Sequence, residues 1–277
     1  MESDQDQTGE MLDFALNQMT APKLPLAEFF AMARRVGCSG VELRCDVNPG
    51  FFDTHSPQEI GAVAAAEGLR IHALAELYGF NDLTAERFDH ARALMEMAAG
   101  CGARALILIP LNAGEMISHE QLEEALGRLA PELEAHGLDG LVEPLGFASS
   151  SLRDKAPLVD LLGSMSLTGR IKLLHDTFHH HLAGAGPVFG KQTGLVHISG
   201  VSRELPADKM TDGDRGLVTQ VDRLGNLDQI AALTAGGYEG AFSFEAFSKE
   251  VHTLSDPSAA LAASINLIAT QLSAEAA

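Results

Sequence analysis

The chain has 277 residues, which fits one α/β barrel of ~250 residues, and its 46% hydrophobic and 21% charged residues are those of an ordinary globular protein. Its formal net charge of -19 repels phosphate and argues against nucleic acid as a partner. The three cysteines are too few for a disulfide framework, no apolar run approaches the ~20 residues that span a membrane, and the acidic N-terminus is unlike a signal peptide. We therefore expect a cytoplasmic protein with no membrane and no nucleic-acid partner.

Short apolar runs alternate with segments of helical spacing along the chain. Residues 1–10 show no periodicity and are predicted to form a flexible acidic tail, while residues 11–277 are predicted to form one domain. The predicted strands lie at 12–16, 40–43, 69–74, 105–109, 140–144, 171–174, 195–200 and 240–245. The predicted helices lie at 26–36, from 56 onward, and at 85–99, 118–135, 151–162, about 227–233 and about 257–272.

The ends of the predicted strands recur at intervals of mostly 27 to 34 residues. Eight strand-then-helix units of this size are typical of a single-domain (β/α)8 TIM barrel, in which the C-terminal ends of all strands meet at one face. The short interval after Asp176 predicts a reduced helix, and the long interval after His197 predicts an extended loop at about 202–223. An open doubly wound sheet is the alternative, but no glycine-rich turn follows the first strand.

The fifth to eighth predicted strands each end in a side chain that can bind a metal. These side chains are Glu143, Asp176, His197 and Glu245. Three carboxylates close together need a compensating cation, and three oxygens with one imidazole suit one divalent ion, with Mn²⁺, Mg²⁺ or Co²⁺ ahead of Zn²⁺. Taken singly, Glu143 could be a surface acid, Asp176 a helix N-cap and His197 a core histidine. Their succession in four consecutive strands favours a metal site.

The same face of the predicted barrel should hold the substrate. Asn17 and Glu76 also end predicted strands and are expected to line the pocket. A divalent ion there would leave one or two positions open for substrate oxygens and could stabilise the negative charge that forms when a carbon-bound proton leaves. Glu143 and Glu245 are the candidate base and acid for this proton transfer. His175 should point away from the barrel interior if Asp176 points inward.

Six segments carry a resemblance to a known family. They are FALNQMTAP (14–22), GVELR (40–44), GLVEPLGF (140–147), HDTFHHH (175–181), VHISG (196–200) and FSFE (242–245). With these segments the chain resembles the xylose isomerase-like TIM barrel superfamily of sugar isomerases and epimerases, and within it the inosose (2-keto-myo-inositol) isomerases. The resemblance runs from the first predicted strand to the eighth. It implies an isomerase that interconverts keto-cyclitols by proton transfer through a metal-bound enediolate.

The resemblance also implies roles for individual residues. In that superfamily a Glu, an Asp, a His and a second Glu from strands five to eight bind one divalent ion, and they map onto the four residues named above. A histidine three residues after the aspartate contacts substrate, which implies His179, and an arginine six residues after the strand-seven histidine implies Arg203. Ketose epimerases carry a second glutamate six residues beyond the strand-five ligand, where this chain has Ser149. This departure points away from a simple ketose 3-epimerase.

Several other functions remain open at this stage. A ketose epimerase, a hydroxypyruvate-type isomerase, or an inosose dehydratase, which is a lyase, would begin with the same proton abstraction. A barrel-type metallonuclease needs a basic surface, and the acidic charge counts against it. A non-catalytic binding protein would need no stoichiometric metal. For the isomerase, epimerase and dehydratase the partner is a small-molecule keto-cyclitol or keto-sugar, and assembly into a homo-oligomer stays open.

Overall fold

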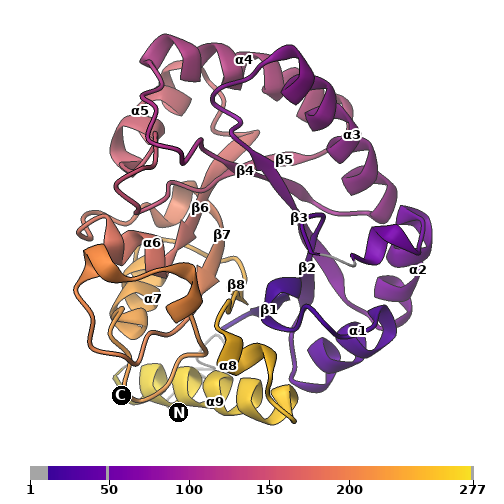
Figure 1. Ribbon diagram of the computed structural model, residues 1–277, viewed down its shortest axis with the longest axis vertical. Helices are drawn as coiled ribbons and strands as arrows, with labels where there is room; N and C mark the ends of the chain where they lie inside the picture. Colours follow the sequence, from indigo (N-terminus) through magenta and orange to yellow (C-terminus); the bar gives the residue numbers. More distant parts are fainter. Residues whose placement is uncertain (1–11, 48–49, 276–277) are drawn as a thin grey trace, which may run out of the picture.

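The computed structural model describes residues 12–47 and 50–275, and it shows a closed barrel of eight parallel strands surrounded by helices (Figure 1). Neighbouring strands pair in chain order from β1 to β8, and β8 pairs with β1 to close the ring. The predicted single-domain (β/α)8 TIM barrel is therefore confirmed. The predicted tail at 1–10 lies outside the described residues.

The elements follow one another as strand-then-helix units. The strands are β1 (Phe14–Asn17), β2 (Gly40–Arg44), β3 (Arg70–Tyr78), β4 (Ala105–Ile109), β5 (Asp139–Val142), β6 (Ile171–Asp176), β7 (Thr193–Ile198) and β8 (Phe242–Phe244). The α-helices are α1 (Leu26–Arg35), α2 (Pro57–Ala66), α3 (Ala85–Cys101), α4 (His119–Ala135), α5 (Lys155–Ser164), α6 (Thr177–Leu182), α7 (Asn226–Ala235), α8 (Lys249–His252) and α9 (Pro257–Glu275). Short 3-10 helices are η1 (Gln18–Thr20), η2 (Phe51–Asp53), η3 (Gly190–Gln192), η4 (Ala207–Lys209) and η5 (Asp212–Asp214).

The predicted helix at 151–162 begins four residues later than expected. The side chain of Asp154 accepts a hydrogen bond from the backbone N–H of Ala156 at 3.0 Å, so it caps the first turn of α5. Residues 151–154 therefore belong to the loop that follows β5. This shift matters for the site because it makes Lys155 the first residue of a helix packed against β6.

The two irregular intervals in the sequence correspond to two irregular connections. After β6 the chain forms α6, which has six residues and is the reduced helix that the short interval predicted. After β7 the extended connection contains η4 and η5 and is joined to the end of β7 by an antiparallel bridge between Gly200 and Gly216. Both connections leave the C-terminal ends of their strands, so they border the mouth of the barrel.

Alternate residues of each strand face two different apolar layers. In β4, Ile107 belongs to a cluster inside the barrel, whereas Leu106 and Leu108 belong to the larger cluster between the strands and the helices. Small side chains such as Ala15 and Ala73 help to fill the inner cluster. The inner row of each strand therefore leads up to the mouth, where polar side chains replace apolar ones.

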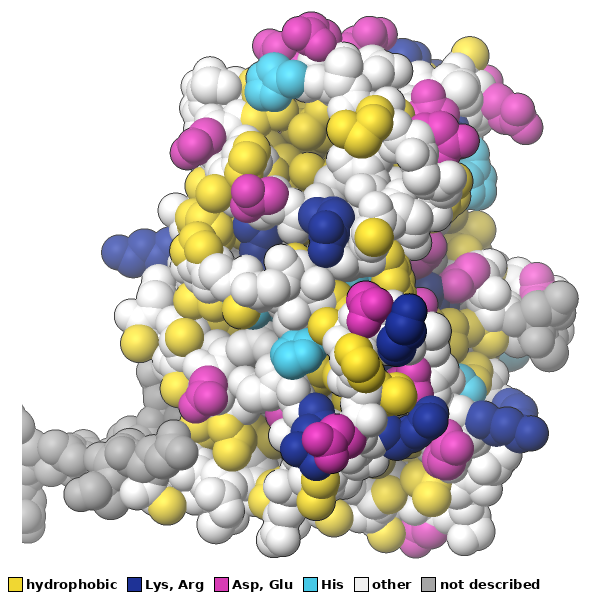
Figure 2. Space-filling model, turned by 60° about the vertical axis from the view of Figure 1, so that its left-hand side comes forward, with side chains coloured by type: hydrophobic (Ala, Val, Ile, Leu, Met, Phe, Trp, Pro, Cys, Tyr) yellow, Lys and Arg dark blue, Asp and Glu magenta, His cyan; other side chains and the backbone are white. Residues whose placement is uncertain are grey.

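The outer surface carries charges of both signs. On the face drawn in Figure 2, acidic and basic side chains are interspersed. In the part of the chain that the structure describes, no helix combines the length and the apolar character that crossing a membrane would need.

Candidate metal centre

The four residues predicted to bind metal share one orientation. Each of them lies two or four residues after an apolar side chain of the inner cluster. Because side chains in a strand alternate between two faces, each shares the face of that apolar residue and points toward the barrel axis. The pairs are Leu141 with Glu143, Leu174 with Asp176, Leu195 with His197, and Ala241 with Glu245. The local pattern of each strand thus delivers one polar side chain to the mouth.

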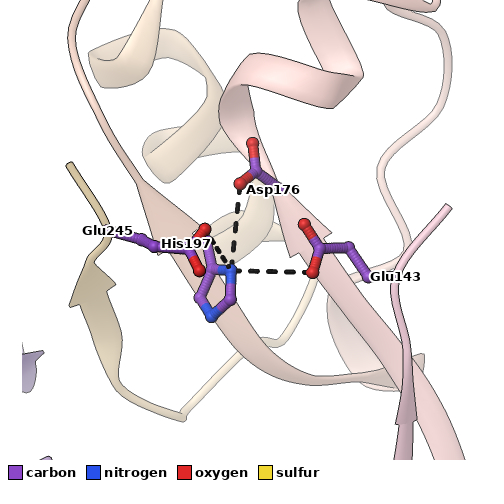
Figure 3. Close-up of side chains that lie close together, drawn as sticks. All are labelled: Glu143, Asp176, His197 and Glu245. Atoms are coloured by element: carbon purple, nitrogen blue, oxygen red, sulfur yellow. Dashed lines mark ion pairs between the residues drawn. The ribbon is translucent and has the colours of Figure 1, made fainter. Parts of the chain in front are cut away.

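These four side chains form a compact buried cluster (Figure 3). One ligand atom from each lies within 4.8 Å of all the others. His197 Nδ1 lies 3.1 Å from Glu245 Oε2 and 3.8 Å from both Glu143 Oε2 and Asp176 Oδ2. No side chain in the cluster is more than 5% exposed. We call these four residues, which could hold one metal ion, the metal centre.

The ring of His197 is oriented by a residue from the opposite side of the barrel. Its Nε2 lies 2.9 Å from Glu42 Oε2, and because a carboxylate can only accept, Nε2 carries the proton and donates it. Glu42 is fully buried in β2. Among the described residues, His197 Nδ1 has no hydrogen-bond partner. A histidine fixed in this way by a carboxylate offers its free nitrogen to a metal, so the donor set fits one divalent ion.

Asp176 has a structural role in addition to its place in the metal centre. Its Oδ1 accepts hydrogen bonds from the backbone N–H groups of Phe178 at 2.7 Å and His179 at 3.0 Å, so it caps α6. Its Oδ2 faces the cluster. The N-cap alternative and the metal-ligand alternative are therefore compatible, because each uses a different oxygen of the same carboxylate.

Two buried arginines hold Glu245. Arg44, at the end of β2, places Nη1 2.7 Å from Glu245 Oε1, and Arg215, in the loop after β7, places Nη2 2.7 Å from Glu245 Oε2. Burial by itself raises the pKa of Glu245, but in the absence of an ion the protonated ring of His197 and the guanidinium of Arg215 outweigh it and leave this pKa well below its usual value. Burial raises the pKa of Glu143, which has no arginine partner among the described residues.

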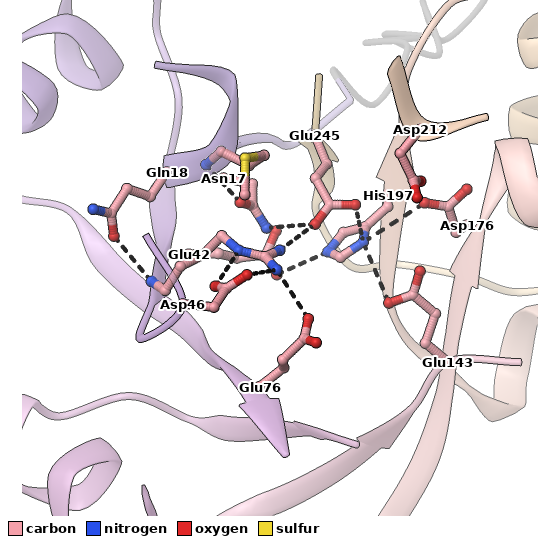
Figure 4. A network of polar contacts seen from close by, with 12 residues as sticks. Asn17, Gln18, Glu42, Asp46, Glu76, Glu143, Asp176, His197, Asp212 and Glu245 are labelled. Atoms are coloured by element: carbon pink, nitrogen blue, oxygen red, sulfur yellow. Dashed lines mark hydrogen bonds and ion pairs between the residues drawn. The ribbon is translucent and has the colours of Figure 1, made fainter. Parts of the chain in front are cut away.

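Most of the predicted substrate residues lie around the metal centre (Figure 4). Asn17 Nδ2 donates to Glu245 Oε1 at 3.3 Å, and Glu76 Oε2 accepts from Arg44 Nη2 at 2.9 Å. His179 is 4% exposed, and its Nε2 lies 3.7 Å from Glu143 Oε1. The structure therefore brings Asn17, Glu76 and His179 into direct contact with the centre or with the arginine that holds it.

Arg203 does not join this group. Its side chain is 72% exposed and pairs with Asp214 at 2.9 Å, whereas Arg215 of the same loop is buried and contacts both Asp176 and Glu245. Counting six residues from His197 to find the arginine assumes that the loop after β7 has the same length as in the superfamily. In this chain that loop is long. Glu42 and Arg44 also contact the centre, and neither was predicted from the sequence. The sequence did contain one signal for them. Both are charged residues in a short strand, and they lie two and four residues after Gly40, on the same face of that strand.

The neighbouring histidines form a separate network outside the barrel wall. Lys155 Nζ lies 2.9 Å from His175 Nδ1 and 3.0 Å from His180 Nδ1, and His175 Nε2 lies 2.9 Å from Gln229 Oε1. His175 thus points away from the interior, as expected from the inward direction of Asp176. Burial lowers the pKa of Lys155 from its ordinary value of 10.5 to about 7, although the charges of Asp176 and Glu143 oppose the shift.

Glu42→Gln should weaken metal binding by about 10-fold to 100-fold, because a neutral amide holds the His197 ring less firmly and makes its free nitrogen less basic. Calorimetric titration of the metal-free protein with Mn²⁺ measures this change. Glu96→Gln, at an exposed position of α3, is the matched control and should bind like the wild type. Equal affinities for Glu42→Gln and the control would contradict the role assigned to Glu42.

Lys155→Met should change how stability depends on pH. Above pH 7 the unfolded chain keeps a proton on Lys155 that the folded chain lacks, so this residue's contribution to the free energy of unfolding rises with pH, by at most ~1.4 kcal/mol per unit. The difference between wild type and Lys155→Met should therefore move in favour of the wild type from pH 7 to pH 9. Urea unfolding at three pH values tests this, with exposed Lys23→Met as control. A difference that stays constant would argue against the shifted lysine.

Comparison with known proteins agrees with the fold. Residues 30–271 match the model of the family described as xylose isomerase-like TIM barrel. A xylose isomerase domain containing protein from Salmonella typhimurium is 34% identical, with a TM-score of 0.88 over 95% of this chain and 98% of its own. The search of curated proteins found no match.

Two more distant structures share the fold. The IolI protein, solved with a bound zinc atom, is 18% identical, with a TM-score of 0.83 over 94% of this chain and 99% of its own. An L-ribulose 3-epimerase is 19% identical, with a TM-score of 0.72 over 96% and 97%. The family model covers most of the sequence and the Salmonella protein nearly all of it. The chain therefore belongs to the xylose isomerase-like TIM barrel family.

Proposed function

We propose that this protein is a divalent-metal-dependent isomerase of keto-cyclitols of the 2-keto-myo-inositol type. The observation that carries the proposal is the free Nδ1 of His197, buried and surrounded by three carboxylate oxygens at 3.1 to 3.8 Å. The fold that the chain shares with the IolI protein and with an L-ribulose 3-epimerase supports a sugar isomerase or epimerase. The resemblance to inosose isomerases adds the cyclitol.

A divalent ion bound here would polarise the ketone oxygen and stabilise the negative charge that develops on proton removal. The chain's own residues would then move the proton. Glu143 and Glu245 lie on opposite sides of His197 Nδ1 (Figure 3). Both oxygens of Glu245 accept from guanidinium groups, whereas Glu143 faces only histidines, at 3.7 and 3.8 Å, among the described residues. These contacts leave Glu143 freer to take the proton from carbon, and Glu245 is its partner in the exchange.

Other residues around the centre would position the substrate. His179 Nε2 lies beside Glu143 and can donate to a substrate oxygen whose charge changes. Asn17 and Glu76 supply polar groups for hydroxyls at the rim of the centre. Burial of the cluster keeps bulk water away, which strengthens each of these interactions. Mn²⁺ stays our preferred metal, and a cytoplasmic location and a homo-oligomer stay expectations.

Incubation of the protein with 2-keto-myo-inositol and Mn²⁺ in D₂O tests the reaction class. We expect NMR to show deuterium entering at a carbon next to the ketone, together with a new keto-cyclitol of the same composition. Net loss of water would indicate the dehydratase. Exchange with ketoses but not with keto-cyclitols would indicate an epimerase or a hydroxypyruvate-type isomerase, and it would contradict the cyclitol assignment.

Glu143→Gln should lower turnover by about 100-fold or more, because an amide cannot carry the proton. Deuterium incorporation measured with saturating Mn²⁺ reports this step directly, and a metal titration shows whether the variant still binds the ion. Glu96→Gln is the matched control. A Glu143→Gln variant that binds metal and exchanges deuterium at the wild-type rate would exclude Glu143 as the proton carrier.

A further inference from the structure

One fixed positive charge lies inside the metal centre. The guanidinium of Arg215 is 2% exposed, and its Nη2 contacts Asp176 Oδ2 at 2.5 Å and Glu245 Oε2 at 2.7 Å. These are the same two oxygens that lie 3.8 Å and 3.1 Å from His197 Nδ1. Two of the three carboxylate oxygens around His197 Nδ1 are therefore already shared with an arginine.

The guanidinium contacts two aromatic rings and donates several hydrogen bonds. The rings of Phe178 and Phe247 lie with their centroids 5.2 Å and 4.5 Å from its central carbon. Its Nε donates to Ser199 Oγ at 3.2 Å, and its Nη1 donates to Asp212 Oδ1 at 3.1 Å. This side chain is thus pre-organised, because two aromatic rings contact its central carbon and all three of its nitrogens donate hydrogen bonds.

The backbone that carries Arg215 is held as firmly as the side chain. Its carbonyl accepts from the N–H groups of Phe247 at 2.9 Å and Ser248 at 2.8 Å, and the next residue, Gly216, exchanges two hydrogen bonds with Gly200. A Cβ built on Gly200 would lie 2.4 Å from the carbonyl oxygen of Leu217, so glycine is needed for this close approach. The loop therefore presents Arg215 to the centre in one position.

A fixed cation at this place has two opposite effects on the centre. It draws Asp176 and Glu245 together and offsets their mutual repulsion, which stabilises the folded chain in the absence of an ion. It also repels any second cation that the same carboxylates bind, and it draws electron density from their oxygens. Both effects follow from the sign of the charge and its distance from the two carboxylates.

We propose that Arg215 is a positioning residue that sets the metal affinity of the centre, by holding Asp176 and Glu245 in place while opposing the divalent ion for their oxygens. The inference rests on the proposed metal dependence. As a consequence, a protein that keeps the four ligand residues but lacks the charge of Arg215 would bind an ion more tightly than the wild-type protein does. Arg215 thus lowers the affinity of the centre for metal and keeps the centre folded when no metal is bound.

Arg215→Met tests the inference, because methionine keeps a long, unbranched side chain beside the two rings but carries no charge. We expect at least 10-fold tighter Mn²⁺ binding by calorimetry and a lower melting temperature of the metal-free protein, which Mn²⁺ restores. Arg215→Lys keeps the charge and should bind Mn²⁺ close to the wild type. Arg223→Met, an exposed position of the same loop whose side chain is 46% accessible, is the matched control and should change neither quantity.

The behaviour of Arg215→Met distinguishes an effect on metal affinity from a role in packing or in ordering the ligands. Equal or weaker Mn²⁺ binding by a folded Arg215→Met would overturn the inference, because the arginine would then only order the ligands. If this variant folds solely with Mn²⁺ present, the ion replaces the missing charge and the inference is supported. If it fails to fold even with millimolar Mn²⁺, the arginine serves packing and the inference fails. A wild-type protein that binds no divalent ion would instead contradict the proposed function.

Discussion

The mouth of this barrel depends on keeping three buried carboxylates close to one another. Their mutual repulsion, in a site with little access to water, would spread them apart or protonate them unless positive charge were placed nearby. The chain provides that charge from two distant places, Arg44 at the end of β2 and Arg215 in the loop after β7. Both reach the same glutamate, one at each oxygen. Electrostatic balance at the mouth therefore joins the first quarter of the chain to the last.

The fold and the meeting of four ligand-type side chains at the mouth were readable in the sequence for the same physical reason. A parallel strand buried on both faces must be apolar along its length, so a polar residue at its end stands out, and alternation decides which way it points. Asp176 and His197 follow inward leucines by two residues, and the ordering of strands in a barrel brings such ends together. Elements that break the repeat, such as α6, were visible as irregular intervals.

The parts that escaped prediction depend on contacts between distant segments. Nothing near His197 in the sequence indicates that Glu42, on a strand across the barrel, would orient its ring. Arg203 and Arg215 stand in the same loop with equal chemistry, and the hydrogen bonds of Gly200 with Gly216 select the one that turns inward. Loop length and cross-barrel pairing are tertiary properties, so a spacing rule taken from relatives could not supply them.

Asp176 has a geometric consequence of its own. One of its oxygens bonds the backbone N–H of His179, so the distance from this carboxylate to the histidine beside Glu143 is fixed by three residues of covalently connected, hydrogen-bonded chain. Changes in the surrounding loops can widen or narrow the rest of the pocket, but they leave this spacing as it is. The separation between the Asp176 carboxylate and the segment that carries His179 is therefore set by the first turn of α6 itself and is independent of the long loop after β7.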